Sequence, residues 1–212
     1  MAEDTRRFWY YEHVCTHPSP FLRYYVWQQT AITVGFTQGA YARKNLHVFE
    51  VPSHQIAVRP TGGGIVFHRP GDLTYALYVP LQSLPCVTGT MEDVFMSLSQ
   101  PLLDTLAQFG CKGSVHKSTQ AKRKGRRCQN AMCFADVEGY EIQLDGKKIL
   151  GQAQRKGRQV LLAQGTFQNL PLKENQYDPF VSQWGIKIVE ALRAWGANSR
   201  ASANSIPALE TA

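Results

Sequence analysis

Three residues that can take part in chemistry lie in the middle of the chain: His68, Cys133 and Lys148. A cysteine becomes a nucleophile when nearby positive charge lowers the pKa of its thiol, and a lysine ammonium can bind a developing oxyanion. Each has a more common explanation when it stands alone. A single cysteine is usually a small buried hydrophobe, a single lysine a solvated charge, and a single histidine a structural residue. Taken one at a time, the three therefore indicate no function.

Three consecutive glycines, Gly62 to Gly64, lie between strand-like runs in the stretch RPTGGGIVFH, which begins at Arg59. Glycine is unfavourable inside a strand, because it loses much conformational freedom on folding and has no side chain to pack. The spacing matches neither phosphate-loop fingerprint, and a strand follows rather than a helix. The bare backbone offers N–H donors to a carbonyl, carboxylate or phosphate oxygen, and Arg59 is a natural anion partner. A structural bulge explains the glycines alone equally well.

Nearly all of the net charge of +7 comes from one basic segment, residues 117–127, which reads KSTQAKRKGRR and contains no acid. We interpret this segment first as a solvated surface loop. A docking site for an acidic partner is the second interpretation. Nucleic acid ranks last, because no aromatic residue is interleaved to stack on bases. The residues that would contact an acidic partner are Lys122, Arg123, Lys124, Arg126 and Arg127.

Composition limits the class of protein. The 212 residues, 43% hydrophobic and 18% charged, fit one globular domain, which we place at 1–196, with a tail at 197–212 that we expect to be disordered. The absence of a long apolar run or a signal-peptide pattern predicts a cytoplasmic protein with no membrane contact. The 5 cysteines form no CxxC pair, which favours reduced thiols and argues against a metal site.

The elements that must position these residues are strands in consecutive hairpins with helices between them. The sequence predicts an α+β fold with a mixed, largely antiparallel β-sheet flanked by helices. Asp145-Gly146 is a strong hairpin turn, and Thr90 and Gly110 are expected to cap a helix that Pro101 kinks or splits. Strands are expected at 21–27, 31–38, 55–60, 64–69, 73–80, 140–144, 147–154 and 159–167. Helices are expected through Val14, at 39–46, between Thr90 and Gly110, and at 179–196, where Gly196 closes the last one.

Three segments occur together in an order that resembles the lipoate–protein ligase and octanoyltransferase family: Arg59 to His68, Gly146 to Ala153, and Gln164-Gly165-Thr166. Trp27 to Gln38 also resembles the early strand pair of that family, and the resemblance extends to about residue 170. It implies a biotin/lipoate protein ligase-like catalytic domain whose glycine loop lies along the acyl chain and its head group. The substrate-binding residues it implies are Arg59, Thr61, Gly62, Gly63, Gly64, His68, Gly151, Ala153, Gln164 and Gly165.

The family contains two chemistries. In ligases, ATP and lipoate give lipoyl-adenylate, which a lysine of a lipoyl domain attacks. In one branch of octanoyltransferases, a cysteine takes the octanoyl group from acyl carrier protein as a thioester and passes it to that lysine. The segment from Cys133 to Gln154 resembles the cysteine branch, which implies Cys133 as the nucleophile and Lys148 as the residue that binds the oxyanion. The chain also lacks room for the extra C-terminal domain of many bacterial ligases, which favours the transferase or a ligase whose second domain is a separate protein.

The transferase is the first hypothesis and requires no cofactor, whereas an ATP-dependent ligase is the second and would require ATP and Mg²⁺. The ligase hypothesis persists because Gly62 to Gly64 read as in ligases and because the Pro and Ser usual after the cysteine are missing after Cys133. The expected acceptors are lipoyl domains of 2-oxoacid dehydrogenases or of the glycine cleavage carrier protein, and acyl carrier protein is the expected donor. A third hypothesis is a non-catalytic protein that binds an acyl carrier or RNA through residues 117–127.

Overall fold

The computed structural model describes residues 2–40, 52–84, 90–117 and 140–203. Two sheets carry the fold. The larger is antiparallel throughout, in the order β1-β5-β9-β8-β7-β6, and the smaller has the order β3-β2-β4, with β2 parallel to β3. The strands are β1 Phe21–Val26, β2 Ala31–Val34, β3 Ile56–Val58, β4 Val66–His68, β5 Leu73–Pro80, β6 Gly113–Lys117, β7 Tyr140–Leu144, β8 Lys147–Lys156 and β9 Val160–Phe167.

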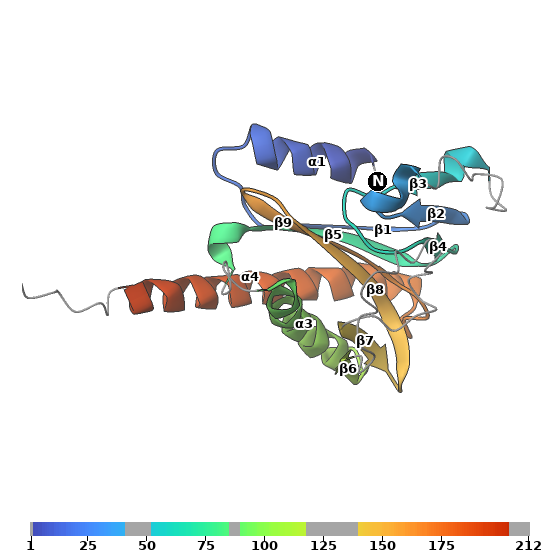
Figure 1. Ribbon diagram of the computed structural model, residues 1–212. Helices are drawn as coiled ribbons and strands as arrows, with labels where there is room; N and C mark the ends of the chain where they lie inside the picture. The colour runs from blue at the N-terminus through green and yellow to red at the C-terminus, as the bar shows by residue number, and fades with distance from the viewer. Residues whose placement is uncertain (1, 41–51, 85–89, 118–139, 204–212) are drawn as a thin grey trace, which may run out of the picture.

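Helices cover both faces of the larger sheet (Figure 1). α1 and the smaller sheet lie on one face, and α3 and α4 lie on the other. The main core forms between the sheet and α3 and α4, around large buried side chains such as Trp184, Phe180 and Tyr75. The helices are α1 Ala2–His13, α3 Met91–Gln108 and α4 Tyr177–Ala203, with single 3₁₀ turns at Phe36–Gln38, Ser53–Gln55, Leu81–Ser83 and Glu174–Gln176.

The two central strands, β5 and β9, are buried along their whole length, because both faces of the sheet are covered. Side chains alternate across β9, as strand geometry requires. Leu161 and Ala163 pack into the core beneath α3 and α4, whereas Val160 and Leu162 pack against α1. The fold predicted from sequence, α+β with a mixed and largely antiparallel sheet, is confirmed.

Local signals placed the turns and caps correctly. Asp145 and Gly146 both have positive φ, of 48° and 72°, which is the backbone of a two-residue hairpin turn between β7 and β8. Thr90 caps α3, since its side chain accepts from the N–H of Asp93 while the Asp93 carboxylate accepts from Thr90. Gly110 follows the helix with a φ of 79°.

Pro101, which was expected to kink or split α3, lies inside the helix and does not split it, because one missing N–H donor can be tolerated where the apolar face of the helix is buried on both sides of it. The predicted end of α4 is wrong. α4 does not end at Gly196 but continues to Ala203. A glycine inside a helix costs only about 1 kcal/mol relative to alanine, and the sequence after Gly196 contains the strong helix former Ala.

Other differences concern short elements. The strand expected at 31–38 ends at Val34 and is followed by a 3₁₀ turn, and β6 was not predicted. Most of the helix expected at 39–46 lies outside the described residues, as does the end of the tail after Ala203. In the part of the chain that is described, no helix has both the length and the apolar character needed to cross a membrane.

Candidate functional site

A pocket of about 350 Å³, including its open mouth, lies where β5, β8 and β9 of the larger sheet meet the smaller sheet. The structure brings most of the predicted substrate-binding residues together here, from three separate segments of the chain. The predicted residues that line the pocket are Arg59, Gly63, His68, Gly151, Ala153, Gln164 and Gly165. The other lining residues are Thr33, Val66, Thr74, Gln152 and Thr166.

The guanidinium of Arg59 is buried and holds the glycine loop, which we define as residues 61–64. One of its terminal nitrogens donates to the carbonyls of Gly62 and Gly64, at 3.0 and 2.7 Å. The other donates to the carbonyl and hydroxyl of Thr33, at 2.9 and 2.8 Å. Because a trans peptide places N–H opposite C=O, the Gly62–Gly63 peptide directs its N–H away from the guanidinium. Arg59 therefore shapes the loop, a role beyond the anion partner expected from sequence.

The glycines in and beside the loop differ in how strongly the fold requires them. Gly63 has a φ of 87°, a left-handed conformation that residues with a Cβ rarely adopt. A Cβ at Gly35, on the neighbouring segment, would lie 2.1 Å from the carbonyl oxygen of Gly63, so only glycine permits this approach. A Cβ at Gly62 would meet no atom within 4 Å. The space beside Gly62 is therefore open in the protein itself. A ligand that occupies this space would give a reason for glycine at position 62.

His68 lies in the wall of the pocket as a neutral, buried imidazole. Its Nε2 is 2.8 Å from the hydroxyl of Thr33, and its ring stacks on Trp27 with a centroid distance of 4.1 Å. The side chain is 1% exposed. Burial, and secondly the positive charge of Arg59, lower the pKa of His68 to about 3. His68 is therefore uncharged near neutral pH and acts as a hydrogen-bonding group of the wall.

This neutral state predicts a pH dependence of stability. Because the folded pKa lies below the unfolded value of about 6.5, the unfolded chain takes up a proton first as the pH falls, and the free energy of unfolding decreases from about pH 6.5 downwards. The contribution is fully present above that pH and is lost towards about pH 3. This component is absent in His68→Gln. Urea unfolding at about pH 7.5 and about pH 5 should therefore show that the free energy of unfolding falls by about 2 kcal/mol more in the wild type than in the variant. Equal losses would contradict a neutral buried imidazole.

One side chain of the pocket lining is held from α1, which sequence reasoning did not connect to the site. The buried carboxylate of Asp4 accepts from Gln164 Nε2 at 3.1 Å and from an Arg23 guanidinium nitrogen at 2.7 Å. Gln164 Oε1 in turn accepts from the hydroxyl of Thr61 at 3.0 Å. A buried charge needs such partners, but no local pattern in the sequence reveals them, because Gln164 follows Asp4 by 160 positions.

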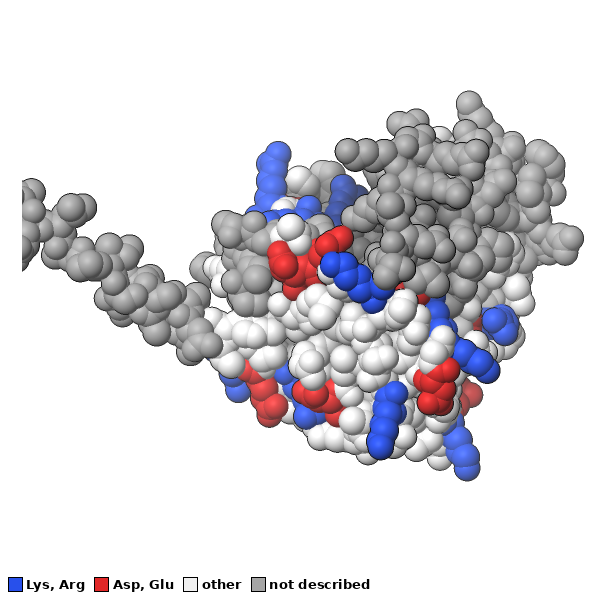
Figure 2. Space-filling model, turned by 60° about the horizontal axis from the view of Figure 1, so that its bottom comes forward, with Lys and Arg blue, Asp and Glu red and all other residues white. Residues whose placement is uncertain are grey.

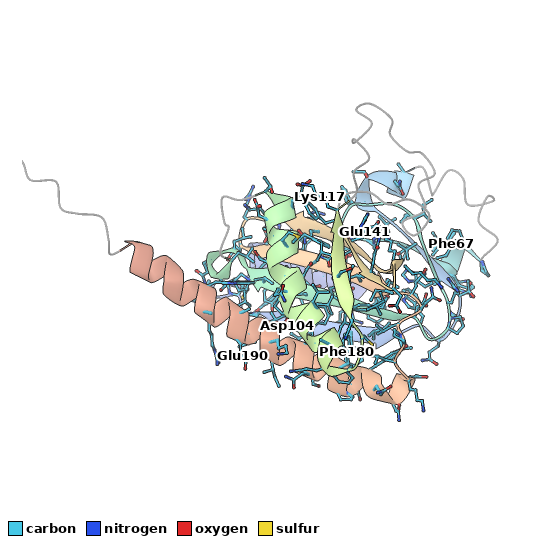
Figure 3. The ribbon with its side chains drawn as sticks, turned by 90° about the horizontal axis from the view of Figure 1, so that it is seen from below. Phe67, Asp104, Lys117, Glu141, Phe180 and Glu190 are labelled. Atoms are coloured by element: carbon cyan, nitrogen blue, oxygen red, sulfur yellow. The ribbon has the colours of Figure 1, made fainter. Side chains whose placement is uncertain are left out.

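Lys148 does not line the pocket but lies on the same strand, β8, as Gly151 and Ala153. Its ammonium donates to Glu141 Oε1 on β7 at 2.5 Å, and the two side chains are only 13% and 3% exposed. The second oxygen of Glu141, Oε2, is buried without a hydrogen-bond partner. Glu141 is labelled in Figure 3 on the face seen from below, at the same end of the β6–β7 pair as Lys117. Glu141 is a second residue that sequence reasoning missed.

Two other predictions concern residues beyond the described ranges: Cys133, and the docking residues Lys122, Arg123, Lys124, Arg126 and Arg127. On the described surface that Figure 2 turns forward, acidic and basic side chains are interspersed, and neither sign gathers into a patch. Among the described residues, no group of three or more His, Cys, Asp or Glu side chains could hold a metal ion.

Comparisons with known sequences identify the family to which the chain belongs. The family model described as the lipoyl protein ligase A/B catalytic domain matches residues 7–202. The octanoyltransferase LipM of Carboxydothermus hydrogenoformans is 30% identical over 154 residues, which are 73% of this chain and 55% of that protein. The LipM of Staphylococcus aureus is 27% identical over 165 residues, which are 76% of this chain and 59% of that protein. This chain thus spans little more than half the length of the curated relatives it matches.

Solved structures share the fold at low sequence identity. The protein Ta0514 of T. acidophilum with bound lipoic acid has a TM-score of 0.61 and 14% identity, covering 92% of this chain and 87% of that one. A lipoate-protein ligase A bound with ATP has a TM-score of 0.55 and 14% identity, covering 89% and 84%. These similarities show that the fold is shared.

Proposed function

We propose that this chain transfers an octanoyl group to a lysine of a lipoyl domain. The chain belongs to the lipoyl protein ligase A/B catalytic-domain family. One observation carries the proposal. Gly63 of the glycine loop, Gly151 and Ala153 on β8, and Gln164 and Gly165 on β9 line a single pocket, although they come from distant parts of the sequence. Those are the segments in which this chain resembles the family. The two curated relatives described above, from Carboxydothermus hydrogenoformans and Staphylococcus aureus, are octanoyltransferases.

The reaction consists of two acyl transfers. The thiolate of Cys133 attacks the thioester carbonyl of an octanoyl-loaded acyl carrier protein, a new C–S bond forms, and the carrier leaves as its thiol. The amine of the acceptor lysine then attacks the enzyme thioester, an amide forms, and the Cys133 thiol is released. The overall step needs no ATP, because an amide is more stable than a thioester. Each attack passes through an oxyanion, whose stabilisation by fixed donors is a large part of such catalysis.

The described residues supply the environment for these steps. His68 is neutral, and the guanidinium of Arg59 is engaged by backbone carbonyls, so the pocket wall can accept an uncharged acyl chain without leaving a charge unpaired. Lys148 lies on β8, the strand that carries Gly151 and Ala153 of the pocket wall, and it is held by Glu141. We assign to Lys148 the binding of the oxyanion. The pair with Glu141 keeps its charge in place between turnovers.

ATP-dependent ligation remains the second candidate, because the glycine loop reads Gly-Gly-Gly as in the ligases of this family. In that reaction, N–H groups of the glycine loop and the ammonium of Lys148 would bind the adenylate phosphate. Modification of a lipoyl domain by free lipoate with ATP and Mg²⁺, and its failure with octanoyl acyl carrier protein, would favour this candidate. The reverse pair of results is expected for the transferase.

Gly62→Ala tests whether the acyl group lies along the loop. The added Cβ meets no protein atom within 4 Å, and the φ of Gly62 is not in the left-handed region, so the melting temperature should stay close to that of the wild type. An acyl chain against that face would be displaced, which raises KM for the acyl donor by about tenfold, equivalent to about 1.4 kcal/mol. Steady-state kinetics with octanoyl acyl carrier protein measures the change. An unchanged KM would place the acyl chain elsewhere.

A further inference from the structure

We propose that Asp4 is a positioning residue that fixes the direction of a hydrogen-bond relay leading to the glycine loop. Asp4 lies on α1, outside every motif that predicted the site, and its side chain is completely buried. A buried carboxylate is costly unless charged or hydrogen-bonding partners replace the lost water. Two partners of the Asp4 carboxylate come from β1 and β9, so its burial links α1 to the larger sheet at the pocket.

The relay runs through four side chains. The carboxylate of Asp4 accepts from Arg23 at 2.7 Å through one oxygen and from Gln164 Nε2 at 3.1 Å through the other. Gln164 Oε1 accepts from the hydroxyl of Thr61 at 3.0 Å. Thr61 opens the glycine loop and is itself buried, and its carbonyl accepts the N–H of Phe36 at 2.9 Å. The relay therefore reaches the first residue of the loop, whereas Arg59 binds the carbonyls of Gly62 and Gly64.

The charge at position 4 fixes the order of donors and acceptors. An ionised carboxylate can only accept, so Gln164 must turn its NH₂ group towards Asp4 and its oxygen towards Thr61. The hydroxyl of Thr61 must then donate. An amide or hydroxyl at position 4 could donate or accept, and the Gln164 amide could turn over. Asp4 thus selects one orientation of a side chain that lines the pocket.

Glu12, at the other end of α1, provides the matched control. Its carboxylate accepts from the backbone N–H groups of Arg158, Gln159 and Val160, in and after the turn between β8 and β9. In Figure 1 the N-terminal end of α1 lies beside the smaller sheet, and its other end lies over that turn. Glu12 therefore anchors α1 to the β8–β9 hairpin through a carboxylate, as Asp4 does. The hydrogen bonds of Glu12 go to the turn and not to the residues that line the pocket.

Amide hydrogen exchange of the full chain tests the relay without relying on catalysis. In Asp4→Asn, we expect the peptide that covers residues 61–64 to exchange at least about tenfold faster than in the wild type, because one end of the loop loses its fixed support. In Glu12→Gln, that peptide should exchange as in the wild type, while the turn at 157–160 exchanges faster. Equal exchange of residues 61–64 in the three proteins would overturn the proposal.

A double-mutant cycle separates the relay from a purely structural role of Asp4. Asp4 and Thr61 do not touch each other, so their effects on kcat/KM for octanoyl transfer should multiply if no relay joins them. With the relay, Thr61→Val should cost at least about threefold less in the Asp4→Asn background than in the wild type. Glu12→Gln and Thr61→Val should multiply in either case. Multiplying effects in both cycles would overturn the relay.

Two further outcomes have definite meanings. If Asp4→Asn yields no folded protein, Thr61→Val takes its place in the exchange experiment, because it removes the last donor and leaves the charges of Asp4 and Arg23 paired. Unchanged exchange of the loop in that variant would then overturn the relay. The inference depends on the proposed function in one respect, which is that the loop forms a wall of the acyl site. An inactive wild type with faster loop exchange in Asp4→Asn would therefore contradict octanoyl transfer and support the relay.

Discussion

Cys133→Ala should fold like the wild type and transfer no octanoyl group from acyl carrier protein to a lipoyl domain. Without the thiol no thioester can form, and direct attack by the acceptor lysine on the carrier thioester would lack the positioned intermediate. We expect kcat to fall by at least about 10³-fold, the order of effect that removal of a covalent nucleophile produces. The measurement is the rate of mass increase of the lipoyl domain, with circular dichroism as the check on folding.

Cys15→Ala is the matched control for this experiment. Cys15 is a free, half-buried cysteine that packs against the small core between α1 and the larger sheet, away from the pocket lining. Its replacement also removes one thiol and should leave kcat within about twofold of the wild type. Full activity of Cys133→Ala would make the thioester step wrong, whereas a loss in both variants would point to a general effect of cysteine replacement.

Lys148→Met should lower kcat for octanoyl transfer by about 10²- to 10³-fold, with a much smaller change in KM. Removal of a single oxyanion donor has an effect of this size in acyl-transfer enzymes, because the interaction strengthens only in the transition state. Methionine keeps most of the length and apolar surface of the lysine stem. The measurement is steady-state kinetics at saturating acceptor.

The ion pair makes a second variant necessary. Lys148→Met leaves the buried carboxylate of Glu141 without its cation, and breaking a buried pair in this way typically destabilises a protein by about 3–5 kcal/mol. Lys148→Met with Glu141→Gln removes the unpaired charge, so its stability should recover while kcat stays low. Lys147→Ala, on the exposed neighbour, controls for position on β8. Recovery of kcat together with stability in the double variant would assign Lys148 to folding alone.

The parts of the fold that sequence predicted are those set by near neighbours. Asp145-Gly146 specifies a hairpin turn because both positions need positive φ, and Thr90 caps α3 through a residue only three positions away. Three adjacent glycines drew attention to the loop because they are unfavourable in a strand, but they predicted a site only together with Gly146 to Ala153 and Gln164 to Thr166. The prediction that Gly196 ends α4 was wrong, because a single glycine is only slightly unfavourable inside a helix and does not end it.

The parts that sequence did not predict depend on partners far along the chain. Asp4 and Glu12 read as ordinary acids of an amphipathic helix, and only the folded chain shows one buried against Gln164 and the other against the turn at 157–160. Glu141 likewise reads as a strand residue until β7 and β8 pair and place it beside Lys148. Buried polar contacts between distant residues leave no periodic pattern in either segment, so they must be read from the structure.

Intact mass spectrometry of the purified protein, mixed with octanoyl-loaded acyl carrier protein in the absence of ATP, tests the central claim most directly. The predicted result is a single octanoyl adduct on the wild type that is absent from Cys133→Ala and disappears when a lipoyl domain is added. A contradictory result would be an unmodified protein in that mixture, together with lipoyl-adenylate formation in a second mixture of lipoate, ATP and Mg²⁺. That outcome would make the protein a ligase and leave Cys133 without a catalytic role.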